Sequence, residues 1–226
     1  GQTAQFRDGG VEVVAMDGFS GFKTATAEEL PEATAVMDPP FHASRLAGEK
    51  IDQCRQRVQQ ATLGHRGGRS GGDPLYGIRR VLHTGADLLT DKQITRLKAV
   101  FARDEHVEVE ATWGGIYQRI VAAYRHPPDR ASGKKALQAV IDDLTQGVPT
   151  QLTELITLGR TLKRRALDVL AYFDHPPGTS NGPTEAINGR LEHLRGTALG
   201  FRNLAHYVIR ALLDTGGFRT ELHRHL

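Results

Sequence analysis

The stretch "VEVVAMDGFSGFKTATAEELPEATAVMDPPFH", residues 11–42, decides the fold. It holds two apolar runs rich in β-branched residues, at 11–16 and 33–37, and such runs are typical of strands. Between them, Thr26 and Glu29 have the spacing of a capping box, and a proline then ends the short helix. A strand, a helix and a second strand predict a parallel βαβ unit with a right-handed crossover. The sequence therefore indicates an α/β core.

An aspartate follows each predicted strand: Asp17 follows the first and Asp38 the second. The carboxyl ends of parallel strands meet at one edge of a sheet, where open α/β folds build their sites. Carboxylate oxygens are the ligands that Mg²⁺ prefers, and two such ions catalyse in-line displacement at phosphate. A glutamate from a later helix can complete the set, and Glu185 follows a loop-like "SNGP" at 180–183.

Structural roles stay open for these three carboxylates when spacing alone is considered. Asp17 precedes a glycine and can be a turn residue, and Asp38 precedes a proline and can cap a helix. Glu185 can be a partner of the helix dipole, which is worth about 0.3–1 kcal/mol.

The rest of the sequence is helical in pattern, so the chain is expected to be mostly α by content. Residues 1–40 are predicted to form the core strands, and residues 41–178 a large all-helical insertion. Residues 179–226 predict C-terminal helices of the core.

Within the insertion, several helices have recognisable ends. One is predicted to begin at Thr90 or Asp91, one to span 132–147, and a long one to span 149–173. Residues 107–125 are predicted to begin extended and to continue as a helix.

Charge and composition are compatible with nucleic-acid binding without demanding it. The net charge is +3 and the pI about 9.1. Basic residues, most of them arginine, cluster at 65–80, 159–165 and 190–196. Arginine suits bidentate contact with phosphate, whereas the alternative for each cluster is a solvated surface face.

The single cysteine and the apolar runs bear on the compartment. Cys54 is expected to be a structural or surface residue rather than a catalytic one, because nothing around it in the sequence would activate a thiol. One cysteine forms no internal disulfide, and no apolar run has the length of a transmembrane helix. A cytoplasmic protein is therefore expected.

Three motifs stand in order along the chain: "VEVVAMDGFSGFKTA" at 11–25, "TAVMDPPFHASRLA" at 34–47 and "TSNGPTEAINGRLEHLRGTALGFRNL" at 179–204. Together they resemble the ISL-three-type insertion-sequence transposases, which are DDE enzymes with a ribonuclease H-like core. The third motif is the most specific, with Ser-Asn-Gly, then a glutamate, an asparagine, a basic helix and Gly-Phe-Arg. The resemblance covers essentially the whole chain. It implies an incomplete ribonuclease H-like α/β core with a helical insertion and C-terminal helices.

The resemblance also implies roles for particular residues. Asp17 and Glu185 match catalytic acids that bind metal, and the residues expected to support the site are Asp38, His42, Asn181 and Asn188. Candidates for DNA contact are Arg66, Arg69, Arg190, Arg195 and Arg202. The complete enzyme is expected to use two Mg²⁺ or Mn²⁺ ions, and its DNA partners are the element ends and the target. A homo-oligomer, nucleoid association on DNA and no membrane partner are expected as well.

The sequence departs from the family pattern in two respects. The family's first catalytic aspartate, its zinc-binding module and its helix-turn-helix module are expected upstream of residue 1, so the chain alone is expected not to complete catalysis. Glycine or proline is doubled in "DPPFH", "RGGRSGGDP", "WGGIY", "HPPDR" and "HPPGTS", where single residues are expected at most places. An extra residue inside an α-helix would rotate everything after it by about 100°.

Two further hypotheses compete with the transposase. One is a non-catalytic, basic helical domain that binds DNA or another transposase copy, which the basic clusters and the incomplete set of acids suggest. The other is a different metal-dependent phosphohydrolase that uses Asp17 and Asp38 without Glu185.

Overall fold

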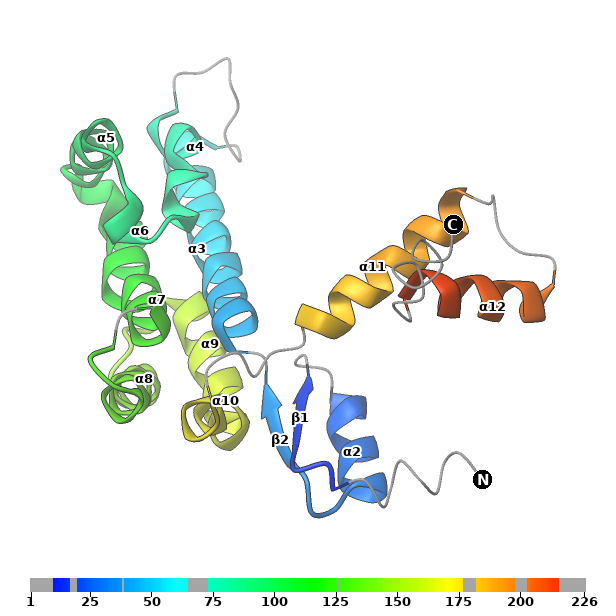
Figure 1. Ribbon diagram of the computed structural model, residues 1–226. Helices are drawn as coiled ribbons and strands as arrows, with labels where there is room; N and C mark the ends of the chain where they lie inside the picture. The colour runs from blue at the N-terminus through cyan, green and yellow to red at the C-terminus, as the bar shows by residue number, and fades with distance from the viewer. Residues whose placement is uncertain are drawn as a thin grey trace. The chain divides into compact units, whose positions relative to one another are not determined.

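The computed structural model describes residues 10–16, 20–37, 39–64, 73–125, 127–176, 182–197 and 203–215. It divides the chain into two compact units, Gly1–Thr179 and Ser180–Leu226. The described part is mostly helical and contains one small parallel sheet of two strands (Figure 1). The expected α-rich α/β content is therefore present. None of the described helices combines the length and apolar character that crossing a bilayer requires.

The predicted βαβ unit is present in the first unit. It consists of β1 (Val13–Met16), α2 (Ser20–Glu29) and β2 (Thr34–Met37). The two strands pair in parallel, with Met16 opposite Met37, so the predicted parallel pairing is confirmed. The predicted helix start at Thr26 is wrong, because the preceding residues contain no proline and α2 extends through them.

Helix α3 (Pro39–Leu63) carries a buried stripe that organises the helical part. The stripe consists of Ala43, Ala47, Ile51, Cys54 and Val58, which are spaced three or four residues apart. It packs against α7 (Gln118–Arg125) and α9 (Thr153–Arg164), which lie beside α3 in Figure 1. Leucine, isoleucine and valine side chains from these helices form one continuous core with the stripe.

The remaining helices of the first unit are α4 (Pro74–Ile78), α5 (Asp91–Phe101), α6 (Val107–Glu110), α8 (Arg130–Gln146) and α10 (Ala166–Ala171). Short 3₁₀ turns occupy Val81–His83, Ala86–Leu88, Asp104–His106 and Tyr172–Asp174. In the second unit, α11 (Gly182–Thr197) and α12 (Leu204–Thr215) pack against each other.

Helix ends that rest on local capping were predicted well. Thr90 caps α5 in a capping box with Gln93, and Gly147 ends α8, both as expected. The start of α8 is two residues earlier than predicted, because the Asp129 carboxylate accepts a hydrogen bond from the N–H of Ser132 at 2.7 Å. Asp129 is therefore the N-cap of α8, and the helix includes the two residues before Ser132.

Two predictions about the insertion are wrong. The stretch 149–173 is not one helix, because the backbone of Arg165 (φ −110°, ψ 15°) separates α9 from α10. Beyond this break, α10 packs against β2. The predicted extended start of 107–125 is helical instead, since Val109 is fully buried in the helical core and this packing overrides its β-branched preference.

The doubled glycine of "WGGIY" is accommodated by a π-helix at Ala111–Tyr117. The N–H of Gln118 bonds to the carbonyl of Trp113, five residues earlier. A π-helical turn holds one more residue than an α-helical turn. The π-helix therefore has room for a residue beyond an α-helical turn, and Ile120 of α7, which follows it, is buried in the core.

Candidate active site

The two parallel strands β1 and β2 end at the same edge of the sheet. Met16 and Met37 are register partners and are the last residues of β1 and β2. Asp17 and Asp38 follow them directly in the sequence, although both aspartates lie outside the described residues. The strands are thus parallel and end side by side, which is the arrangement on which the predicted metal site was based.

Contacts with α10 hold the sheet against the helical part. The Nζ of Lys23 on α2 lies 2.7 and 2.8 Å from the two carboxylate oxygens of Asp168 on α10. Val36 of β2 is fully buried. A pocket of about 330 Å³ lies where these elements meet, lined among others by Lys23, Thr34 and Asp168. Because the two partners of the ion pair are 145 residues apart, no local sequence pattern predicted it.

Helix α3 begins directly after Asp38. Its first residue, Pro39, is tolerated at this position because the first N–H groups of a helix have no intrahelical partner. The doubled proline of "DPPFH" thus lies at the helix start and not inside a helix. His42, a predicted supporting residue, lies in the first turn of α3 and is only 5 % exposed.

The other predicted residues belong to the second unit or lie outside the described part. Glu185 is in the first turn of α11, and its side chain is not described. Asn188, Arg190 and Arg195 are exposed on α11, and Arg195 pairs with Glu192 at 3.0 Å. The positions outside the described residues are Arg66, Arg69, Asn181 and Arg202.

The chemistry of the donor set fits a divalent metal, while the described residues alone do not form a site. Among the side chains that the structure describes, no group of three or more His, Cys, Asp or Glu could hold a metal ion. The predicted ligands Asp17 and Glu185 are not among those side chains. Their carboxylate oxygens are the donors that Mg²⁺ and Mn²⁺ take in proteins.

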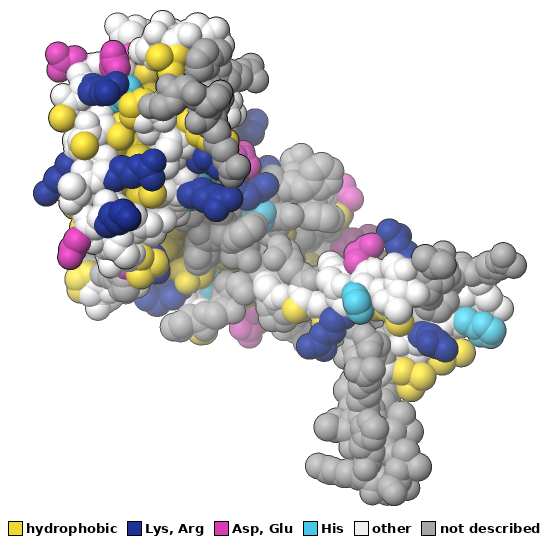
Figure 2. All heavy atoms as spheres, turned by 90° about the horizontal axis from the view of Figure 1, so that it is seen from above, with side chains coloured by type: hydrophobic (Ala, Val, Ile, Leu, Met, Phe, Trp, Pro, Cys, Tyr) yellow, Lys and Arg dark blue, Asp and Glu magenta, His cyan; other side chains and the backbone are white. Residues whose placement is uncertain are grey.

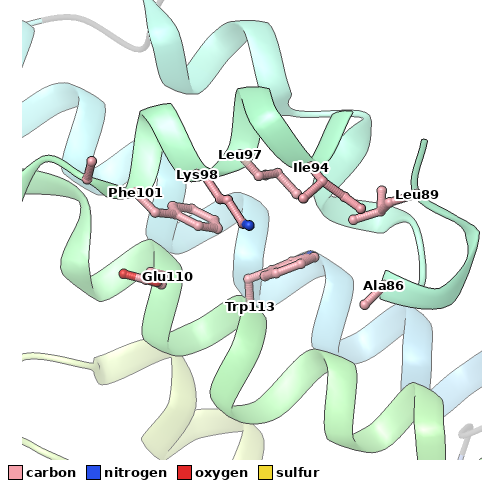
Figure 3. Close-up of a pocket in the computed structure, with 9 residues that line it drawn as sticks. Ala86, Leu89, Ile94, Leu97, Lys98, Phe101, Glu110 and Trp113 are labelled. Carbon is pink, nitrogen blue, oxygen red and sulfur yellow. The ribbon is translucent and has the colours of Figure 1, made fainter. Parts of the chain in front are cut away.

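A separate apolar pocket of about 500 Å³ lies beside α5, and Trp113 forms one of its walls (Figure 3). The ring of Phe101 lies 5.7 Å from that of Trp113, between centroids. Lys98 and Glu110 bring one charge of each sign to the pocket lining. No predicted site residue lines this pocket. It therefore lies among the helices of the first unit and not at the end of the strands.

Cys54 is excluded as a nucleophile by its surroundings. It is free and fully buried in the stripe of α3. Burial raises the pKa of its thiol to about 11, so the thiol is protonated at neutral pH. The expected structural role of Cys54 is confirmed.

Comparisons with known proteins identify the family. A family model of the ISL3 (ISL-three) type of DDE transposases, described as "Transposase", matches residues 2–211. No curated protein and no solved structure shows a significant match. The match includes both strands, the helices between them and α11, and α11 itself, which agrees with the three motifs read from the sequence. The chain belongs to the ISL3-type transposase family, and its function lies in DNA transposition.

Proposed function

We propose that this chain supplies acidic residues of a DDE transposase site that cleaves and joins DNA strands. These residues come from the ends of β1 and β2 and from Glu185 on α11. In this proposal Asp17 and Glu185 bind the divalent metal. The observation that carries it is the parallel pairing of Met16 with Met37, within a family match that spans residues 2–211. This pairing brings the ends of β1 and β2, each followed by an aspartate in the sequence, to the same edge of the sheet. In the proposal, this sheet is part of a ribonuclease H-like core.

The proposed roles follow from the chemistry of each side chain. The carboxylates of Asp17 and Glu185 offer hard oxygen donors. A bound divalent cation would supply Lewis-acid activation of a water or a 3′-hydroxyl and would stabilise the leaving oxygen. His42, which is buried in the first turn of α3, is assigned a supporting role together with Asp38, Asn181 and Asn188.

DNA is the substrate that the family implies, and the basic residues near Glu185 are suited to bind it. Arg190 and Arg195 are exposed on α11, the helix that also carries Glu185. We assign them, together with Arg66, Arg69 and Arg202, to phosphate contacts near the cleaved strand. A homo-oligomer of the complete enzyme is part of the same proposal.

A further acid is needed for strand cleavage. In the family order, another aspartate lies on a strand before β1, and "GQTAQFRDGG" at 1–10 has no apolar strand pattern. We therefore propose that residues 1–226 bind metal and DNA, and that cleavage requires this further acid as well.

Metal binding tests this proposal directly. Mn²⁺ binding to the 226-residue chain is measured by electron paramagnetic resonance for the wild type, Asp17→Asn, Glu185→Gln and a control, Asp142→Asn. Asp142 is an exposed carboxylate on α8, far in sequence from both proposed ligands. Weaker binding in the first two variants, with the control unchanged, is expected.

Equal Mn²⁺ binding in all four proteins would contradict the assignment of the ligands. Cleavage of element-end DNA is assayed in parallel with Mg²⁺. Cleavage by the wild-type chain that is lost in Glu185→Gln would support the site but overturn the need for a further acid.

A further inference from the structure

The outward face of α9 carries cations and no acid. The helix buries Leu155, Leu158 and Leu162 against the core. Its opposite face exposes Thr153, Thr157, Arg160, Lys163 and Arg164. Three- and four-residue spacings place the last three side chains next to one another on the helix surface. We call Arg160, Lys163 and Arg164 the α9 basic face.

The one acid within α9 is turned away from this face. Glu154 is 8 % exposed, and its carboxylate accepts a hydrogen bond from Nε of Arg57 on α3 at 2.8 Å. Burial alone would raise the pKa of Glu154, but the bonds from Arg57 outweigh burial and hold it below the ordinary value. The negative charge of Glu154 is thus matched inside the protein and does not offset the α9 basic face.

The cations of the α9 basic face have no partner within the part of the chain that the structure describes. No ion pair or hydrogen bond of the side chains of Arg160, Lys163 or Arg164 is present there. Elsewhere in the first unit, cations pair with acids of other elements: Lys23 with Asp168, Arg119 with Asp143, Arg125 with Asp87 and Lys134 with Asp174.

This arrangement differs from an ordinary solvated surface. Lys and Arg side chains are spread over the protein surface (Figure 2), and solvated helix faces usually alternate the two signs of charge. The α9 basic face instead concentrates one sign over about one helical turn. It belongs to the basic cluster at 159–165, and the proposed metal site and α11 give this cluster no role.

We propose that the α9 basic face binds the phosphate backbone of duplex DNA. Arg160 and Arg164 are one turn apart, about 6 Å along the helix axis, so both can contact phosphates of one strand. Arginine binds phosphate in a bidentate manner, and such contacts fix the position of the protein on DNA without reading its sequence. The helical insertion then holds DNA in addition to α11. This inference rests on the proposed function, in which DNA is the substrate.

Salt-dependent binding to a 40-base-pair duplex of arbitrary sequence tests the inference. The 226-residue wild-type chain is compared with the triple variant Arg160→Gln/Lys163→Gln/Arg164→Gln. A control triple variant, Lys92→Gln/Arg103→Gln/Lys135→Gln, loses the same charge from exposed positions of the first unit. Glutamine keeps helix propensity close to that of lysine and arginine, and circular dichroism verifies folding.

Loss of three phosphate contacts is expected to reduce the slope of log K against log salt by about 2.7 in the α9 variant. Its affinity is expected to fall at least about tenfold at 50 mM salt, and the control is expected to fall less. Equal losses in the two variants would overturn the inference while leaving DNA as the substrate. If the α9 variant bound DNA like the wild type but no longer self-associated, the inference would be overturned and the α9 basic face would instead bind a second copy of the chain. No duplex binding by the wild type would overturn the DNA-binding role of the whole chain.

Discussion

Lys23 on α2 and Asp168 on α10 form an ion pair between the βαβ unit and the helical part of the first unit, with Nζ–O distances of 2.7 and 2.8 Å. Asp168 is buried, whereas the Lys23 side chain is half exposed. Asp168 lies on α10, which the break at Arg165 separates from α9. Among the residues that the structure describes, this ion pair joins the βαβ unit to the helices.

Lys23→Met is expected to destabilise the protein by about 1–3 kcal/mol, because it leaves the buried carboxylate of Asp168 without its cation. Urea unfolding followed by circular dichroism measures the change. The matched control is Lys134→Met, which removes an exposed pair with Asp174 and is expected to cost less than about 1 kcal/mol. Equal costs for the two variants would show that burial of Asp168 does not matter.

Local patterns allowed part of the fold to be predicted from the sequence. The βαβ unit was predictable because its two apolar runs and their turn residues lie within residues 11–42. The start of α5 was predictable because the capping box of Thr90 and Gln93 is a contact over three residues. The N-cap of α8 was missed because Asp129 and Ser132 both suit that position, and only the backbone decides between them.

Features that depend on distant packing were not predictable. The break at Arg165 follows from the packing of α10 on β2, and Lys23 and Asp168 are 145 residues apart. The candidate site shows the same division. Asp17 and Asp38 followed from strand ends, whereas the role of Glu185 came from resemblance, since a glutamate in a first helical turn is common for electrostatic reasons alone.

Deleting Gly114 is expected to convert the π-helix at Ala111–Tyr117 into an α-helix and to leave the fold intact. The stability is expected to stay the same or to rise by up to about 1 kcal/mol, because a glycine leaves the helix. Thermal unfolding by circular dichroism measures this.

The control for this deletion is the removal of Ala122, an exposed residue inside the α-helical α7. That deletion rotates the residues after it by about 100° and is expected to destabilise the protein strongly. If the Gly114 deletion were as damaging as the Ala122 deletion, the π-helix would not be the device that accommodates the extra residue.

Gly159→Ala is expected to destabilise the protein by about 1–3 kcal/mol, because α8 and α9 approach closely at this glycine. An added Cβ would lie 2.6 Å from the carbonyl oxygen of Leu144, a backbone atom that moves only with its helix. Chemical denaturation measures the cost. Gly115→Ala is the control, since a Cβ added there would meet no neighbouring group within 4 Å, and it is expected to be neutral or stabilising. A neutral Gly159→Ala would mean that the helices separate at little cost.

The ion pair between His83 and Asp52 is expected to make stability depend on pH. Nε2 of His83 lies 2.9 Å from Oδ2 of Asp52. The hydrogen bond to Asp52 raises the pKa of His83 above its ordinary value of 6.5, against the opposing effects of burial and of Arg55. Burial raises the pKa of Asp52, but hydrogen bonds from His83 and Arg55 outweigh burial and lower it below 3.8.

The signs of these shifts define the pH window. The contribution of His83 is complete below pH 6.5 and is lost as pH rises through its folded-state pKa, whereas that of Asp52 is lost as pH falls below 3.8. As pH rises from 6 to 8, the free energy of unfolding of the wild type is expected to fall by up to about 1 kcal/mol more than that of His83→Gln. Glutamine keeps a hydrogen-bond donor but does not titrate. Urea unfolding of both proteins at several pH values measures the difference. Parallel pH profiles for the two proteins would show that folding does not shift the pKa of His83, which would contradict a stabilising ion pair with Asp52.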